Sequence, residues 1–214
     1  MQLIPVLKYG VIISFFITII SLSILVLKTF SFGKRQLYAE PKGNVSKGIV
    51  YAFGKGMMPW EKESAGKHLA GYSAGILYHI GIFVSLAYLF LTIVSFDFPY
   101  LLLLFTRILC LAGAISGFAL LLKRMFSPHL KALSCPDDFA ANIIVTIFVI
   151  LALLHTFSRE ITPFFFLVAI IMFLYIPLGK IRHCFFFFYV RILFGIFYGR
   201  RDIFPQKGVA PPTH

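Results

Sequence analysis

The sequence predicts an all-α integral membrane protein built as a bundle of five helices, and two observations support this fold class. Of the 214 residues, 59% are apolar and only 13% are charged, and the mean hydropathy is +0.90. Soluble globular proteins have about 45–50% apolar and about 25% charged residues. The second observation is that the apolar residues form runs of about 20, the length of a helix that crosses a bilayer. This composition excludes a disordered chain, a soluble enzyme and a disulfide scaffold.

Five apolar runs are predicted to span the membrane. In chain order they cover about residues 4–26, 72–94, 100–122, 139–157 and 163–188, the last with a Phe-rich extension to residue 197. Residues 95–99 and 158–162 are links so short that the helices on either side must pack antiparallel. The first run lacks the charged start and the cleavage site of a signal peptide, so it is expected to remain as a span. Residues 1–200 are expected to form a single transmembrane domain, followed by a tail of residues 201–214.

The orientation follows from the basic residues. The chain has 20 Lys and Arg against 8 Asp and Glu, which gives a net charge of +12. Seventeen of the 20 fall in the loop after the first run, the loop after the third run and the C-terminal segment, which all lie on one side. The other side has only Lys8 and Arg159, and Arg107 lies within the third run. Because basic loops stay in the cytoplasm, the N-terminus is expected outside and the C-terminus in the cytoplasm of a multi-pass protein in the inner (cytoplasmic) membrane. Topology explains the charge, so no nucleic-acid partner is expected.

Two histidines within the spans are candidates for metal ligation, because ionisable groups in a membrane are costly. His79 lies near the cytoplasmic end of the second run. His183 lies at the cytoplasmic end of the fifth run, within the helix if that helix continues through the Phe-rich extension. Two histidines at one depth on separate helices can supply both axial ligands of one haem b. Each could instead be an interfacial or hydrogen-bonded residue.

Residues near these histidines are candidates for cofactor binding. Gly75 and Gly81 leave room beside His79 for a planar macrocycle, although small residues also serve helix packing. Lys180 and Arg182 lie next to His183 and could pair with haem propionates or anchor the helix end at the membrane surface.

His155 lies near the outer end of the fourth run, where no second histidine shares its level. It could bind a quinone head group or transfer a proton, or it could be an interfacial histidine with a polar partner. Asp137 and Asp138 open the same run, where carboxylates favour a helix N-terminus. Cys110, Cys135 and Cys184 lack metal-ligand spacing, so no iron–sulfur cluster is expected on this chain. No catalytic residue is predicted.

The segments YHIGIF (78–83), LLKRMFSP (121–128), PDDF (136–139) and PLGKIRH (177–183) together resemble the gamma subunit of respiratory nitrate reductase, a membrane cytochrome b family. Residues 78–83 (YHIGIF) resemble the second-helix motif of that family. Residues 121–128 (LLKRMFSP) and 136–139 (PDDF) are similar to its loop between helices three and four. Residues 177–183 (PLGKIRH) are similar to its fifth-helix end, where a Lys-x-x-His segment carries a haem ligand. The order and spacing of the segments agree over about residues 72–188. The superfamily includes cytochrome b subunits of heterodisulfide-reductase-like and sulfite-reductase-linked complexes.

The resemblance implies a subunit that relays electrons between the quinone pool and a cytoplasmic iron–sulfur subunit. Such a subunit would be the non-catalytic or quinone-reactive part of an oxidoreductase complex. The usual family member holds a second haem, whose ligand positions correspond here to residues 88–90 and 164–166, where no histidine is present. One haem b, held by His79 and His183, is therefore expected. The alternatives are a cofactor-free membrane anchor subunit and a pigment-binding subunit in which a histidine ligates chlorophyll.

Overall fold

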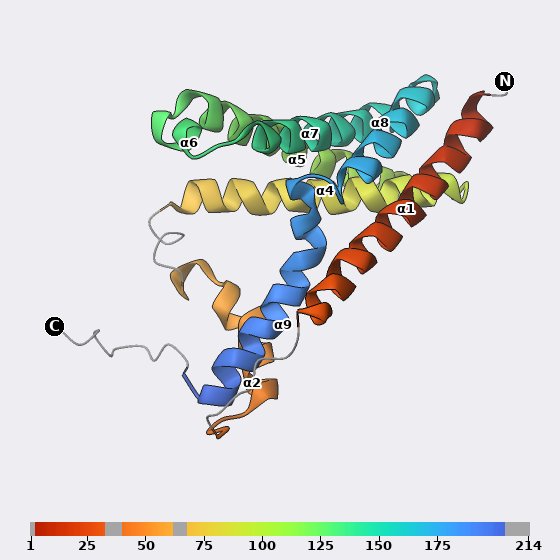
Figure 1. Ribbon diagram of the computed structural model, residues 1–214. Coiled ribbons are helices and arrows are strands. Elements are labelled where there is room, and N and C mark those ends of the chain that lie inside the picture. The colour runs from red at the N-terminus through yellow and green to blue at the C-terminus, as the bar shows by residue number, and fades with distance from the viewer. Residues whose placement is uncertain (1–2, 33–39, 62–67, 204–214) are drawn as a thin grey trace. The chain divides into compact units, whose positions relative to one another are not determined.

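The computed structural model describes residues 3–32, 40–61 and 68–203, and this part of the chain is helical with no strand (Figure 1). Most of the expected C-terminal tail, residues 201–214, lies outside the described residues. The elements are, in chain order, α1 (Leu3–Ser31), α2 (Val45–Phe53), η1 (Lys55–Met57), η2 (Pro59–Glu61), α4 (Leu69–Ile93), α5 (Tyr100–Phe126), α6 (Pro128–Ala132), α7 (Pro136–His155), η3 (Arg159–Ile161), α8 (Thr162–Tyr175), η4 (Lys180–Arg182) and α9 (His183–Arg201).

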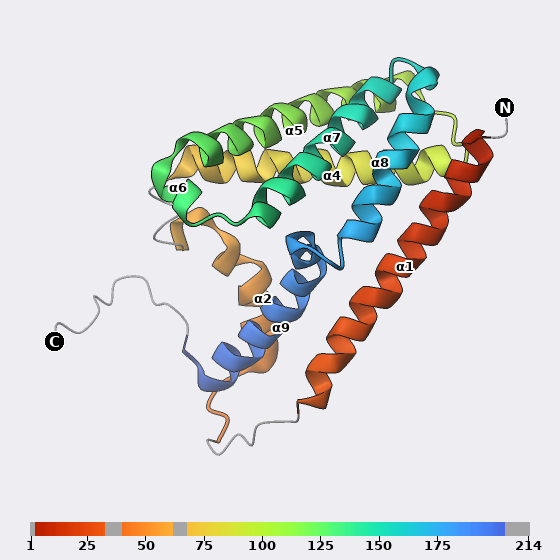
Figure 2. The ribbon, with the colours of Figure 1, turned by 45° about the horizontal axis from the view of Figure 1, so that its top comes forward.

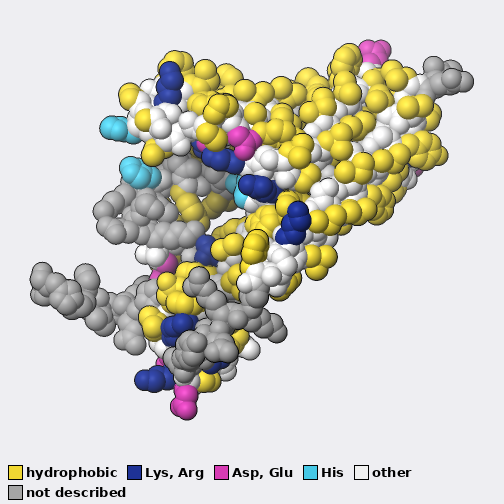
Figure 3. All heavy atoms as spheres, viewed as in Figure 1, with side chains coloured by type: hydrophobic (Ala, Val, Ile, Leu, Met, Phe, Trp, Pro, Cys, Tyr) yellow, Lys and Arg dark blue, Asp and Glu magenta, His cyan; other side chains and the backbone are white. Residues whose placement is uncertain are grey.

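Within the described residues, five helical segments are long and apolar enough to cross a membrane, which is the number that the sequence predicted, although the fifth covers residues 180–201 rather than 163–188. They are α1, α4, α5, α7 and the segment Lys180–Arg201, which joins η4 to α9. Apolar side chains also dominate the visible surface of α1 and of the helices from α4 to α8 (Figure 3). Large exposed apolar side chains on a soluble protein would be an aggregation hazard, whereas lipid is their natural solvent. The chain is therefore a helical, multi-pass membrane protein.

The predicted fifth span is wrong in its continuity, because the helix stops in the middle of the apolar run. Helix α8 ends at Tyr175 after 14 residues, which is about 21 Å of helix. That length is short of the roughly 30 Å of hydrocarbon in a bilayer. Pro177 lacks a backbone N–H and therefore cannot continue the hydrogen-bond pattern of the helix. The Gly179 N–H then closes a turn on the Tyr175 carbonyl oxygen at 3.0 Å. The Phe-rich stretch forms a separate helix, α9, which begins at His183.

Residues 1–200 were expected to form one domain, and the described part of the chain divides into two compact units. Unit 1 consists of residues 3–27 and 68–182, with most of α1 and helices α4 to α8. Unit 2 consists of residues 28–32, 40–61 and 183–203, with α2 and α9.

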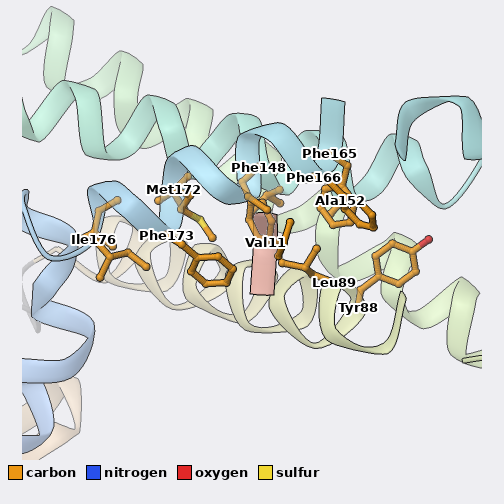
Figure 4. Packing of buried hydrophobic residues seen from close by; sticks show 14 of the residues in the cluster. Val11, Tyr88, Leu89, Phe148, Ala152, Phe165, Phe166, Met172, Phe173 and Ile176 are labelled. Carbon is orange, nitrogen blue, oxygen red and sulfur yellow. The ribbon is translucent and has the colours of Figure 1, made fainter. Parts of the chain in front are cut away.

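Unit 1 is organised around the hairpin of α4 and α5, with α7 packed against both helices and α8 packed against α7 (Figure 2). The close approach of α4 to α5 depends on glycines, since a Cβ at Gly81 would lie 2.6 Å from the Gly113 Cα atom. Figure 4 shows the apolar core, whose buried residues come mainly from α1, α4, α5, α7 and α8. Its fully buried large side chains include Tyr88, Phe148 and Phe165.

Helix α1 joins this core along one side. Val11 of α1 is fully buried in the cluster. The Thr18 hydroxyl donates to the Phe173 carbonyl oxygen of α8 at 2.5 Å. This bond satisfies a polar group within the apolar interior, where an unpaired hydroxyl would be costly.

Unit 2 is a pair of helices that touch along glycines. A Cβ at Gly48 of α2 would overlap the carbonyl oxygen of Gly195 and lie 2.5 Å from the Gly199 Cα atom. Asn44 caps α2 by accepting a hydrogen bond from the Lys47 N–H at 3.2 Å. Small residues in both helices therefore allow their backbones to meet.

Candidate functional site

His79 lies on an exposed face of α4, and one hydrogen bond determines which of its ring nitrogens carries the proton. Its Nδ1 atom is 2.7 Å from the carbonyl oxygen of Gly75, one helical turn earlier. A carbonyl oxygen can only accept, so Nδ1 donates and the lone pair of the neutral ring is on Nε2. Metal-ligating histidines commonly have this arrangement, with Nδ1–H bonded to a backbone carbonyl and Nε2 directed to the metal.

The two glycines predicted to line a cofactor differ in their surroundings. A Cβ at Gly75 would meet nothing within 4 Å, so the surface beside the His79 ring is open there. Gly81 is buried and meets Gly113 of α5. Gly81 therefore serves helix packing, the alternative function that small residues have in membrane helices.

His183, the other predicted axial ligand, is the exposed first residue of α9. The sequence analysis placed His183 within the fifth helix if that helix continued into the Phe-rich extension. The helix does not continue, because α8 ends before His183 and a separate helix begins there. His79 belongs to unit 1 and His183 to unit 2. The binding of both histidines to one iron stays a prediction.

Lys180 has protein partners that the sequence analysis missed. Its ammonium nitrogen lies 2.7 Å from Asp138 Oδ2, and its backbone N–H donates to Asp137 Oδ2 at 2.9 Å. Arg124 of α5 pairs with the other Asp138 oxygen at 3.0 Å. The start of α7 thus holds the segment that follows α8. Arg182 is exposed in η4.

The carboxylates that open α7 also stabilise the helix end, as expected from their position. Asp138 Oδ2 accepts a hydrogen bond from the Cys135 N–H at 2.9 Å and completes a capping box. Asp137 accepts a hydrogen bond from the Tyr175 hydroxyl of α8. The signal in the sequence was the pair of acidic residues after Pro136. Their partners at Tyr175 and Lys180 could be found only from the tertiary fold.

His155 is almost completely buried, with 2% of its surface exposed, and both ring nitrogens are engaged. Nδ1 lies 2.9 Å from the Tyr88 hydroxyl, and Nε2 lies 3.0 Å from the Thr162 hydroxyl. The Thr162 hydroxyl donates its single proton to the Arg159 carbonyl oxygen at 2.5 Å. It must therefore accept from His155 Nε2–H, and the neutral ring accepts from the Tyr88 O–H through Nδ1. The result is a chain of donors that runs from Tyr88 through His155 and Thr162 to a backbone carbonyl.

This arrangement gives His155 the polar partners that one interpretation of the sequence expected. Its use as a quinone or proton site stays a prediction, and a ligand could reach its ring nitrogens only by displacing Tyr88 or Thr162. Neither partner could be found from sequence spacing, because Tyr88 comes from α4 and Thr162 from α8.

His155 also borders a pocket of about 390 Å³ at one end of unit 1. The pocket is formed by the first turns of α1, the end of α4 and the connection between α7 and α8. These three places lie at the same end in both views (Figures 1 and 2). Its polar and charged lining residues are Lys8, Tyr9, Thr92, Ser95, His155, Arg159 and Thr162.

Comparison of the chain with protein-family models, with curated proteins and with solved structures found no match. The resemblance to the nitrate reductase gamma subunit therefore rests on the quoted sequence segments alone.

Proposed function

We propose that the chain is the haem b-carrying membrane subunit of an electron-transfer complex, and that it relays electrons between the quinone pool and a cytoplasmic iron–sulfur subunit. The observation that carries this proposal is the geometry of His79. Its Nδ1–H is bound to the Gly75 carbonyl oxygen at 2.7 Å, so the lone pair is on Nε2, the nitrogen that binds haem iron in such sites. Haem supplies a reversible one-electron carrier when bound.

The surface around His79 suits the apolar faces of a porphyrin. Ile76, Ile80 and Phe83 lie within one turn of His79 on the same helix and are all exposed. Gly75 contributes no side chain to this surface, and nothing covers the position where its Cβ would be. The donor, the apolar flanks and the open space together fit an axial ligand site.

Each of the four residues in the proposed haem site has its own function. His79 would bind the haem iron through Nε2, and the bond from its Nδ1–H to the Gly75 carbonyl oxygen orients the ring for this. His183 would supply the second axial ligand, and Arg182 and Lys180 would face the propionates. Binding a propionate would require Lys180 to exchange or share its ion pair with Asp138, which is 2.7 Å away.

The charge distribution supports the orientation in this proposal. Eleven of the 20 basic residues lie in the loops after the first and third predicted spans, which share one side of the membrane, and this bias predicts an N-terminus outside and a C-terminus in the cytoplasm of the inner membrane. These basic segments offer a surface for an acidic partner subunit. A protease-sensitive tag at each end of the chain, tested in intact cells and in inverted membrane vesicles, measures the orientation directly. A C-terminal tag cleaved from outside intact cells would contradict it.

Haem content tests the function. The full chain is purified from membranes, and its reduced-minus-oxidised spectrum and its haem per chain are measured. One b-type haem per chain is expected, with loss of the signal in His79→Ala and in His183→Ala. The matched control is His129→Ala, because His129 is an exposed histidine on the short helix α6.

The other outcomes are equally informative. Two haems per chain would contradict the single-haem prediction. Absence of haem from an intact, folded complex would favour a cofactor-free anchor subunit, and a bound chlorophyll would favour a pigment-binding subunit. Retention of haem in His79→Ala would remove the observation on which the proposal rests.

A further inference from the structure

The pocket beside His155 brings together two basic residues that the orientation rule leaves unexplained. Lys8 and Arg159 are the only basic residues that the sequence assigns to the side opposite the other seventeen. They are far apart in the chain, yet both line this one pocket. Retention of basic loops in the cytoplasm cannot account for either residue. Their convergence therefore points to a function of their own.

Within the described part of the chain, no acidic side chain compensates the charges in the pocket. No carboxylate is among its described lining residues, and the nearest acidic residues in sequence, Asp97 and Glu160, are exposed and do not line it. Among the described residues, no side chain or carbonyl forms an ion pair or a hydrogen bond with the Lys8 ammonium or the Arg159 guanidinium. The pocket thus holds two positive charges with unused donors.

Arg107 shows what a basic residue looks like when the protein satisfies it. Its Nε donates to the Thr156 hydroxyl at 3.1 Å, and its Nη2 donates to the Thr156 carbonyl oxygen at 2.6 Å. Its guanidinium also covers the Phe157 ring at 4.2 Å. Lys8 and Arg159 have no comparable partners in the described part of the chain.

The hydroxyl groups around the pocket differ in whether they already donate a hydrogen bond within the protein. Thr92 donates to the Tyr88 carbonyl oxygen at 2.8 Å, and Thr162 donates to the Arg159 carbonyl oxygen at 2.5 Å. The Ser95 hydroxyl makes no hydrogen bond with a described residue. Ser95 adopts a left-handed backbone with φ of 58°, where glycine is easier to accommodate. Its hydroxyl is a third donor at the pocket.

We propose that this pocket binds the phosphate head group of an acidic phospholipid. Lys8 and Arg159 pair with the phosphodiester, the guanidinium offering a planar fork that matches phosphate geometry. Ser95 adds a hydrogen bond. A volume of about 390 Å³ is within the usual range of small-molecule sites.

The surroundings favour a lipid over a soluble anion. Ile4, Pro5 and Phe166 complete the wall, so apolar surface lies directly beside the two cations. Part of the lining comes from the ends of α1, α4 and α7, which are long and apolar enough to span a membrane, and the ends of such helices lie at the level of lipid head groups. This inference is independent of haem binding, because none of these residues belongs to the proposed haem site.

The test uses the full chain and counts retained lipids. The protein is exchanged into detergent micelles that contain phosphatidylcholine, with or without phosphatidylglycerol. Native mass spectrometry counts the lipids that stay bound, and the midpoint of thermal unfolding is measured in the same samples. Wild type is expected to retain phosphatidylglycerol and to gain stability from it. The double variant Lys8→Gln/Arg159→Gln is expected to bind it at least about tenfold more weakly, since two charge-assisted contacts are lost.

Three comparisons separate the proposal from its alternatives. The control Lys28→Gln/Lys131→Gln removes the same net charge at exposed positions outside the pocket and is expected to bind phosphatidylglycerol like wild type. Inorganic phosphate is added in place of lipid, and equal stabilisation by phosphate alone would overturn the lipid assignment in favour of a soluble anion. Equal retention of phosphatidylcholine, or equal loss in the control, would overturn the proposal.

A second variant guards against misfolding of the double variant. Ser95→Gly removes the third donor while placing glycine at a left-handed position that favours it. It is expected to fold like wild type and to bind phosphatidylglycerol several-fold more weakly. Unchanged binding in both Ser95→Gly and the double variant would refute the site.

Discussion

Substitution of Gly81 by alanine tests whether α4 and α5 are held at backbone contact. The added methyl group would lie 2.6 Å from the Gly113 Cα atom and 3.2 Å from the Leu109 carbonyl oxygen. Both neighbours are backbone atoms of α5, so they can move only if the helices separate. Overpacking of this kind costs about 1–3 kcal/mol, and the upper part of that range applies to an obstacle made of backbone. The better helix propensity of alanine returns about 1 kcal/mol. We therefore expect a net destabilisation of about 2 kcal/mol.

Gly75→Ala is the matched control, because Gly75 lies on the same helix and its Cβ would meet nothing within 4 Å. This variant has the gain in helix propensity without the clash, so it should be stabilised by up to about 1 kcal/mol. The two variants should differ by about 3 kcal/mol, a difference that cancels effects common to glycine replacement in α4. Unfolding of the purified chain is followed by circular dichroism as denaturing detergent is added to mixed micelles. Equal stability of the two variants would refute the packing argument.

The reciprocal change sharpens the same test. At Gly113, an alanine Cβ would lie 2.7 Å from the Gly81 Cα atom. Once one methyl group has separated the helices, the second meets less resistance. The double variant Gly81→Ala/Gly113→Ala should therefore cost less than the sum of the single changes, a coupling of the kind seen for residues in contact. Strict additivity would mean that the two glycines do not share one contact.

Three further substitutions examine other parts of the chain. Tyr88→Phe removes the hydroxyl that donates to the buried Nδ1 of His155, and it should lower the free energy of unfolding by about 1–3 kcal/mol in the same titration. Asp138→Asn weakens the cap of α7 and two partly exposed ion pairs, so a loss of about 1 kcal/mol is expected, with faster hydrogen exchange confined to the first turn of α7. Gly48→Ala would overlap the Gly195 carbonyl oxygen, and hydrogen exchange in α2 should rise while exchange in α4 stays unchanged.

The positions of the spans could be predicted from the sequence because length and hydropathy determine them. The third run, expected at residues 100–122, is α5 at Tyr100–Phe126, and the fourth, expected at residues 139–157, is α7 at Pro136–His155. The prediction of the fifth span failed because apolar composition does not distinguish a helix from a turn. Pro177 was visible in the sequence, and its lost N–H together with the turn at Gly179 outweighed the continuous hydrophobicity.

The candidate site was predictable only where the contacts are local. The bond between His79 and Gly75 joins residues one helical turn apart, so helical spacing places the two groups together. The partners of His155 come from two other elements, Tyr88 in α4 and Thr162 at the start of α8. The ion pair of Lys180 likewise requires the break after α8 to carry the chain back to the start of α7. Such contacts depend on packing, which no spacing in the sequence encodes.

The pocket at Lys8 and Arg159 also bears on how α1 is attached to the rest of unit 1. Folding brings two like charges to the lining of one pocket at the end of unit 1, and like charges repel each other. One of these charges is on α1 and the other follows α7, so their repulsion opposes the docking of the first turns of α1. A bound phosphodiester replaces this repulsion between Lys8 and Arg159 by attraction, because each cation then faces an anion. Docking of the N-terminal end of α1 should therefore be coupled to acidic lipid, whereas the contacts of Val11 and Thr18 further along the helix should not depend on it.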